Sequence, residues 1–88
     1  MVFKIFEYIG NYGIYIISEM ADLPYKVYND DIQTHLNINR NDFYKIMLSS
    51  GAKRRGCQDK YYFPTYESAE IAILKLEPYL IMATLIGE

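Results

Sequence analysis

The segment LNINRNDFYKIMLSSG, from Leu36 to Gly51, contains in order the signals that end one helix, begin another and end it. Asn37 can adopt the left-handed backbone conformation that follows a helix. Asn39 is a preferred N-cap residue, and Asp42 places a negative charge in the first turn after it. Gly51 is typical of the position after a helix C-terminus. The segment therefore predicts a helix that starts after Asn39 and closes at Gly51.

This helix has one face that is suited to burial, with residues spaced i, i+3, i+4 and i+7. Its members are Phe43, Ile46, Met47 and Ser50. A shorter helix is expected before it over residues 31–36, DIQTHL, with Asn29 or Asp30 as its N-cap. Two short helices joined through residues 36–39 have the spacing of a helix-turn-helix motif, whose turn buries one apolar residue, here Ile38.

The N-terminal segment is rich in β-branched and aromatic residues. Residues 2–9 and 14–18 flank Gly10-Asn11-Tyr12-Gly13, which predicts a β-hairpin with a four-residue loop. A short helix over residues 2–9 is the alternative. Residues 19–28 are expected to be a connector, because Pro24 disfavours helical geometry at the residue before it.

A second hairpin is expected after the two helices. Its strands are residues 52–55 and 60–63, joined through residues 56–59. Thr65 then caps a helix that begins at Tyr66, and Pro78 is expected to end it. Residues 79–86 would form either another short helix or a final strand. The expected buried stripe of the helix is Ala69, Ala72, Ile73 and Leu76.

Length and composition indicate one α+β domain over residues 1–88. Half of the residues are hydrophobic, so a core can form without disulfide or metal support. The single cysteine, Cys57, favours a reducing cytoplasm, and the N-terminus lacks the pattern of a signal peptide. The apolar run at 79–86 is too short to span a bilayer. The expected parts are an N-terminal hairpin (1–20), a helix-turn-helix (29–51), a wing hairpin (52–63), a helix (65–77) and an apolar tail (78–88).

Charge is distributed unevenly along the chain. The net charge is −2 and the sequence pI is about 5.3, whereas domains that bind nucleic acid are usually basic. The second hairpin nevertheless carries a basic cluster, Lys53, Arg54, Arg55 and Lys60. Ten tyrosines supply apolar area with a polar tip, which suits half-buried strands and interfaces.

Residues 31–52 resemble the small winged helix-turn-helix modules of excisionases and the DNA-binding heads of mercury-resistance-type regulators. The matching residues are Ile32, Leu36, Ile38, Asn39, Arg40, Phe43, Tyr44 and Gly51. In these families a basic hairpin wing and another helix follow, as expected here for residues 53–77, while residues 1–28 have no counterpart. The sequence departs from the family pattern at Gln33, where a small residue lets the two helices approach, and at Asn37, which replaces a glycine.

Placing Phe43 at the centre of the buried face turns Asn41, Tyr44, Lys45 and Leu48 outward. In a major groove Asn41 would read adenine, and Arg40 would read guanine or hold a phosphate. Tyr44 and Lys45 would contact the DNA backbone. Leu48 does not fit a groove, and it favours cover by a partner or by the C-terminal segment. The candidate DNA-binding residues are Asn39, Arg40, Asn41, Tyr44, Lys45, Lys53, Arg54, Arg55 and Lys60.

The residue patterns do not indicate an enzyme, a cofactor or a metal site. His35, the only histidine, lacks the neighbours of a catalytic triad or a metal cluster. Asp30 and Asp31 fit the start of a helix better than a catalytic pair. Gly10 and Gly13 fit a turn and lack the lysine of a phosphate-binding loop.

Two functions are compatible with these features. The first is a regulator or excisionase-like accessory factor that binds double-stranded DNA, with Tyr79–Ile86 as the candidate homodimer surface or with another protein partner. Alternatively, residues 79–86 dock onto the N-terminal hairpin of the same chain. The second function is a protein-binding module, such as a compact phage-type inhibitor, that keeps the helix-turn-helix only as a scaffold.

Overall fold

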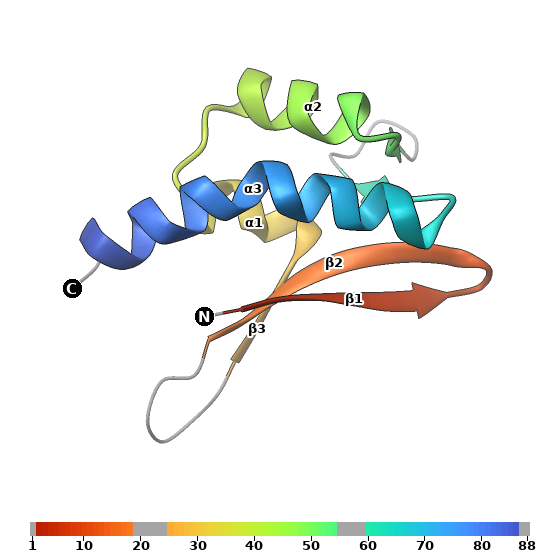
Figure 1. Ribbon diagram of the computed structural model, residues 1–88, viewed down its shortest axis with the longest axis horizontal. Coiled ribbons are helices and arrows are strands. Elements are labelled where there is room, and N and C mark those ends of the chain that lie inside the picture. Colours follow the sequence, from red (N-terminus) through yellow and green to blue (C-terminus); the bar gives the residue numbers. More distant parts are fainter. Residues whose placement is uncertain (1, 19–24, 55–59, 87–88) are drawn as a thin grey trace.

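A three-stranded antiparallel sheet forms the base of the structure, a computed structural model that describes residues 2–18, 25–54 and 60–86 (Figure 1). The elements are β1 (Val2–Tyr8), β2 (Asn11–Ser18), β3 (Tyr25–Tyr28), α1 (Asn29–His35), α2 (Arg40–Ser49), β4 (Lys53–Arg54), β5 (Tyr61–Tyr62) and α3 (Tyr66–Ile86). In Figure 1, α3 crosses above the sheet, and α2 lies above α3. The expected α+β class, with an N-terminal hairpin, two short helices, a second hairpin and a C-terminal helix, is confirmed.

The core lies between the sheet and the helices that contact it. The strand order is β1-β2-β3, and both α1 and α3 pack on β2. Strand alternation turns one set of buried side chains toward the helices: Phe3, Ile14, Ile16 and Val27. The helices contribute Ile32, Met47 and Leu76 to the same buried cluster. Each helix is therefore held by apolar burial on one face.

The first hairpin is confirmed, but its expected four-residue loop over residues 10–13 is wrong. β1 pairs with β2 as far as Tyr8 opposite Asn11, so only Ile9 and Gly10 lie in the turn. Both have positive φ, 48° at Ile9 and 76° at Gly10, as a tight two-residue hairpin turn requires. Residues 2–8 are a strand and not the alternative helix.

A third strand replaces part of the expected connector over residues 19–28. Residues 25–28 form β3, which pairs antiparallel with β2, while residues 19–24 lie outside the described part of the chain. Val27 pairs with Ile16 and is buried, so this short strand extends the apolar face of the sheet. The alternation in YKVY carried this signal, with one apolar side chain inward between two outward residues.

The expected caps of α1 by Asn29 or Asp30 are wrong. The pairing of Tyr28 with Tyr15 keeps the chain extended through Tyr28, which occupies the N-cap position without a side-chain capping bond. The other end of α1 agrees with expectation, because Asn37 has a left-handed φ of 55°.

The start of α3 agrees with the sequence. Thr65 Oγ1 accepts the amide N–H of Ser68 at 3.1 Å, as expected of an N-cap. The predicted stripe faces the core: Ala69, Ala72 and Leu76 are buried, and Ile73 is half-buried.

The expected break at Pro78 is wrong, because α3 continues as one helix of 21 residues through both the expected helix and the expected tail. Proline removes one helical hydrogen bond, the one to the carbonyl of Leu74. Both residues lie on the exposed side of α3, where water can solvate the carbonyl. Leu76 and Leu80 stay buried on the opposite side and hold the helix to the core across the proline. No helix in the described residues is long and apolar enough to cross a membrane.

Replacing Ile9 with asparagine should stabilise the protein. Ile9 has φ 48° and is 80% exposed, so its β-branched side chain strains the backbone while burying little apolar surface. Asparagine tolerates this conformation, and we expect Ile9→Asn to raise the free energy of unfolding by about 1 kcal/mol in urea denaturation. Ile71→Asn, at an exposed position of α3, is the control and should not stabilise. Equal or lower stability of Ile9→Asn would contradict the strained turn.

Candidate nucleic-acid interface

The turn between α1 and α2 is held by one residue on each side. Ile38 is buried, as expected, and its amide N–H donates to the carbonyl of Gln33 at 3.0 Å. The side-chain Nε2 of Gln33 donates in return to the carbonyl of Ile38, also at 3.0 Å. Gln33 lies half-buried beside the turn. The large residue at this position therefore clamps the turn with its amide group.

Asn39 begins α2 as the sequence predicts. Its Oδ1 accepts the amide N–H of Asn41 at 2.8 Å, and its carbonyl accepts the amide N–H of Phe43 at 2.9 Å. Asp42 lies in the first turn, where its charge favours the helix N-terminus. The side-chain oxygen of Asn39 is thus used to fix the direction in which α2 leaves the turn.

Aromatic packing holds the second hairpin against α2. The rings of Phe43 and Tyr61 are both buried and meet edge to face, with centroids 5.7 Å apart at 79°. Gly51 has φ 101°, and the amide N–H of Ala52 then donates to the carbonyl of Met47 at 3.0 Å. These contacts turn the chain directly from the end of α2 into β4.

Four of the predicted site residues and one unpredicted residue surround a single hollow of about 280 Å³. They are Arg40, Asn41, Tyr44, Arg54 and Tyr61. The guanidinium carbon of Arg54 lies 5.3 Å from the centroid of the Tyr44 ring, a cation–π contact that joins β4 to α2. The hollow is therefore lined by two arginines, one asparagine and two tyrosines.

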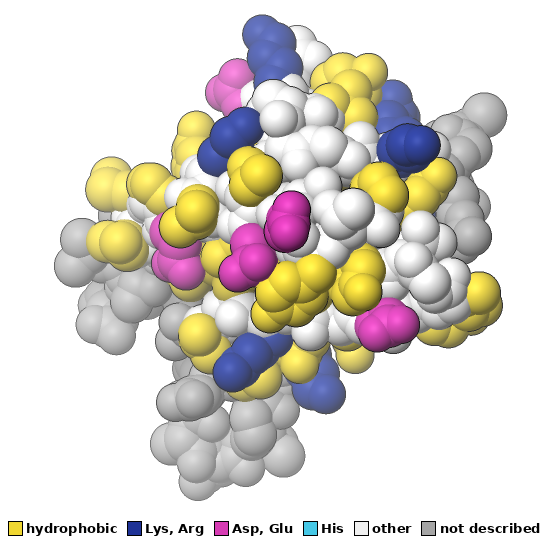
Figure 2. Space-filling view, turned by 45° about the vertical axis from the view of Figure 1, so that its right-hand side comes forward, with side chains coloured by type: hydrophobic (Ala, Val, Ile, Leu, Met, Phe, Trp, Pro, Cys, Tyr) yellow, Lys and Arg dark blue, Asp and Glu magenta, His cyan; other side chains and the backbone are white. Residues whose placement is uncertain are grey.

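Lys45 extends this surface by one helical turn from Asn41. Both residues are exposed, and neither is covered by the N-terminal hairpin or by the end of α3. Figure 2 shows Lys and Arg side chains along the upper edge and upper right, where α2 and the second hairpin lie in Figure 1. Leu48, also expected to face outward, is 37% exposed.

The predicted basic cluster of the wing is divided between two faces. The pairs Lys53–Tyr62 and Arg54–Tyr61 alternate, so among the described residues of this cluster Arg54 alone turns toward α2. Lys60 lines a separate cavity near the first hairpin. Arg55 lies outside the described residues. Sequence reasoning missed Tyr61 as a site residue, although its place opposite Arg54 in the hairpin was the available signal.

Comparisons of this chain with protein-family models, with curated proteins and with solved structures find no match. Among the described residues, no group of three or more His, Cys, Asp or Glu side chains is placed to hold a metal ion. The functional interpretation of this site therefore depends on the geometry of its own residues.

Truncation of Gln33 tests whether its side chain clamps the turn or separates the helices. Gln33→Ala removes the bond to the Ile38 carbonyl, and we expect it to lower the free energy of unfolding by about 1 kcal/mol. Thr34→Ala, at an exposed position of the same helix, is the control and should cost less. A gain in stability for Gln33→Ala would instead indicate that the glutamine holds α1 and α2 apart.

Proposed function

We propose that the protein binds double-stranded DNA through α2 and β4, as a small non-enzymatic regulator or excisionase-like accessory factor. The single observation that carries this proposal is the hollow that Arg40, Asn41, Tyr44 and Arg54 share on the exposed side of α2. The order of turn, capped helix, hairpin and long helix also agrees with the winged helix-turn-helix resemblance.

The dimensions of α2 suit the major groove. Its 10 residues span about 15 Å, and a groove about 12 Å wide admits one helix. The amide of Asn41 matches the N6 and N7 edge of adenine, and the guanidinium of Arg40 matches guanine or a phosphate. Tyr44, Lys45 and Arg54 would hold the phosphates on either side and set the register of the helix.

The net negative charge of the chain means that only the surface just described is expected to attract DNA. With a net charge of −2, the molecule as a whole does not attract a phosphate backbone. Asp42 is also exposed in the first turn of α2. We therefore expect weak affinity for random duplex DNA, with a salt slope that corresponds to a few phosphate contacts, each contributing about −0.9.

Charge reversal on this surface tests the proposal. We expect wild-type binding to a fluorescent random duplex to fall steeply between about 50 and 200 mM salt, as measured by anisotropy. Lys45→Glu and Arg54→Glu should each weaken binding roughly tenfold or more and reduce the salt slope by about one contact.

Lys75→Glu is the matched control, because it changes the net charge by the same amount as Lys45→Glu at an exposed position of α3. A general charge effect would weaken all these variants alike and would contradict the proposed surface. Absence of duplex binding by the wild-type protein at low salt would also contradict it.

We also propose that two copies pair through the outer face of α3. Leu74 is 72% exposed and Ile81 57% exposed, on the side of the helix opposite Leu76. With Ile71 and Pro78 they follow the alternating three- and four-residue spacing of helices that pack against each other. Pairing would let two α2 helices contact two half-sites, which a domain of this size needs for tight binding.

Sedimentation equilibrium tests the pairing. The wild-type chain should show a concentration-dependent dimer, and Leu74→Glu with Ile81→Glu should give a monomer with an unchanged circular dichroism spectrum. Ile9→Glu replaces an exposed isoleucine outside α3 and should leave the dimer intact. A wild-type monomer at all concentrations would contradict the pairing.

A protein-binding module is the second candidate function. The exposed apolar face of α3 favours it, because contiguous exposed apolar side chains mark interaction sites. Under this alternative, the wild-type chain is a monomer without duplex affinity, and Lys45→Glu leaves its partner binding unchanged. The anisotropy and sedimentation measurements therefore separate the two functions.

A further inference from the structure

The sheet face turned away from the helices is aromatic, although an exposed face of an antiparallel sheet is usually polar. Strand alternation places four rings on it: Phe6, Tyr8, Tyr15 and Tyr28. The rings of Phe6 and Tyr28 meet edge to face with centroids 5.7 Å apart, and Tyr15 lies within 6.0 Å of both. Tyr8 is 62% exposed at the end of this row.

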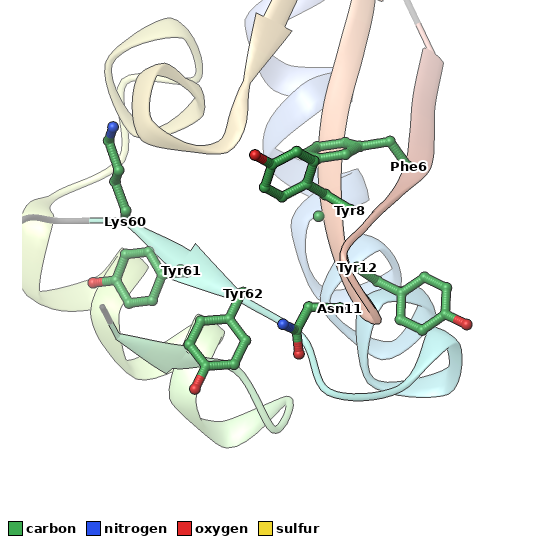
Figure 3. Close-up of a pocket in the computed structure, with 8 residues that line it drawn as sticks. Phe6, Tyr8, Asn11, Tyr12, Lys60, Tyr61 and Tyr62 are labelled. Atoms are coloured by element: carbon green, nitrogen blue, oxygen red, sulfur yellow. The ribbon is translucent and has the colours of Figure 1, made fainter. Parts of the chain in front are cut away.

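A cavity of about 140 Å³ lies between the first hairpin and β5 (Figure 3). Figure 3 shows Phe6 and Tyr8 on one side of it and Tyr61 and Tyr62 on the other, with Asn11 between them. The Phe6 ring lies over Gly13, where any side chain would collide with it. The lining of this cavity is thus mostly aromatic, like the sheet face beside it.

Backbone hydrogen bonds fix the two walls of this cavity relative to each other. Tyr12 and Phe63 exchange two bonds, N–H to carbonyl in each direction, both 2.8 Å long. The ring of Tyr12 points away from the cavity and meets Tyr66 of α3 edge to face at 5.9 Å (Figure 3). The aromatic walls are therefore preformed.

Within β1, β2 and β3, the charged side chains on this face are lysines. Lys26 Nζ lies 5.5 Å from the centroid of the Tyr15 ring, and Lys60 lines the cavity. Glu7, the one acidic residue within β1, β2 and β3, pairs with Tyr12 and so belongs to the opposite face of the sheet. Aromatic rings with flanking cations suit single-stranded nucleic acid, since its bases stack and its phosphates need neutralising. A duplex cannot use such a face, because its bases are already stacked.

We propose that this aromatic face binds single-stranded DNA. One base enters the cavity beside Tyr8 and Tyr62, with its phosphate near Lys60, and neighbouring bases lie toward Tyr28 and Lys26. The choice of DNA rests on the proposed function, because Tyr61 lines both this cavity and the hollow beside α2. A strand that leaves a duplex held by α2 reaches the cavity at this shared residue.

The test uses the full chain and a fluorescent oligothymidine of about 12 nucleotides, long enough to cross the face. Wild-type protein should bind it with salt-dependent affinity. Tyr8→Leu, which keeps apolar bulk but removes the ring, and Lys60→Glu should each weaken binding roughly tenfold. A 2-aminopurine placed in the oligonucleotide should be quenched by wild-type protein and less so by Tyr8→Leu.

Tyr25→Leu and Lys75→Glu are the matched controls, since both replace exposed residues outside this face. They should leave oligothymidine binding unchanged. Absence of wild-type binding at low salt, or equal losses in the controls, would overturn the proposal, as would tighter binding of oligouridine than of oligothymidine.

The two DNA proposals can fail separately. Oligothymidine binding that needs Tyr8, in a chain without duplex affinity, would support this site and contradict the α2 surface. Duplex binding that needs Arg54, without any oligothymidine binding, would support the α2 surface and contradict the aromatic face.

Discussion

The edge-to-face contact between Phe43 and Tyr61 joins two elements that could not stand alone. α2 has only 10 residues, fewer than an isolated helix needs in water, and β4 and β5 have two residues each. Both rings are buried in the same core cluster. Because this contact sets the distance between α2 and β4, it also sets the distance between Asn41 and Arg54.

The position of Tyr61 connects the two candidate surfaces. On one side it borders the hollow that contains Arg40 and Arg54, and on the other it borders the cavity that contains Tyr8 and Lys60. The second hairpin therefore lies between the two surfaces. Arg40, Asn41 and Arg54 are on the α2 side, and Tyr8, Tyr62 and Lys60 are on the sheet side. The proposed duplex and single-stranded DNA contacts would therefore use different sides of the same short hairpin.

Features that depend on local chemistry were predictable from the sequence. The Asn39 cap, the turn around Ile38, the left-handed Asn37 and the closing Gly51 each need only neighbouring residues, and these predictions were confirmed. Features that depend on distant contacts were not. Pro78 fails to end α3 because Leu76 and Leu80 are buried by the sheet and the other helices, and the turn at Ile9 is imposed by strand register.

The candidate site divides in the same way. Helical spacing correctly placed Asn41, Tyr44 and Lys45 on the exposed side of α2. It could not show that Arg54 alone among the described wing cations turns toward α2, because that depends on the pairing of β4 with β5. Nor could it show that Lys60 and Tyr8 line one cavity, because that depends on the bonds between Tyr12 and Phe63.

The decisive experiment for the proposed contact of α2 and β4 with DNA records amide chemical shifts of the labelled protein while duplex DNA is added at low salt. We expect the largest changes to fall together on residues 40–45 and 53–54, which the Phe43–Tyr61 contact brings onto one surface. Changes confined to α3, or no changes at any duplex concentration, would contradict it.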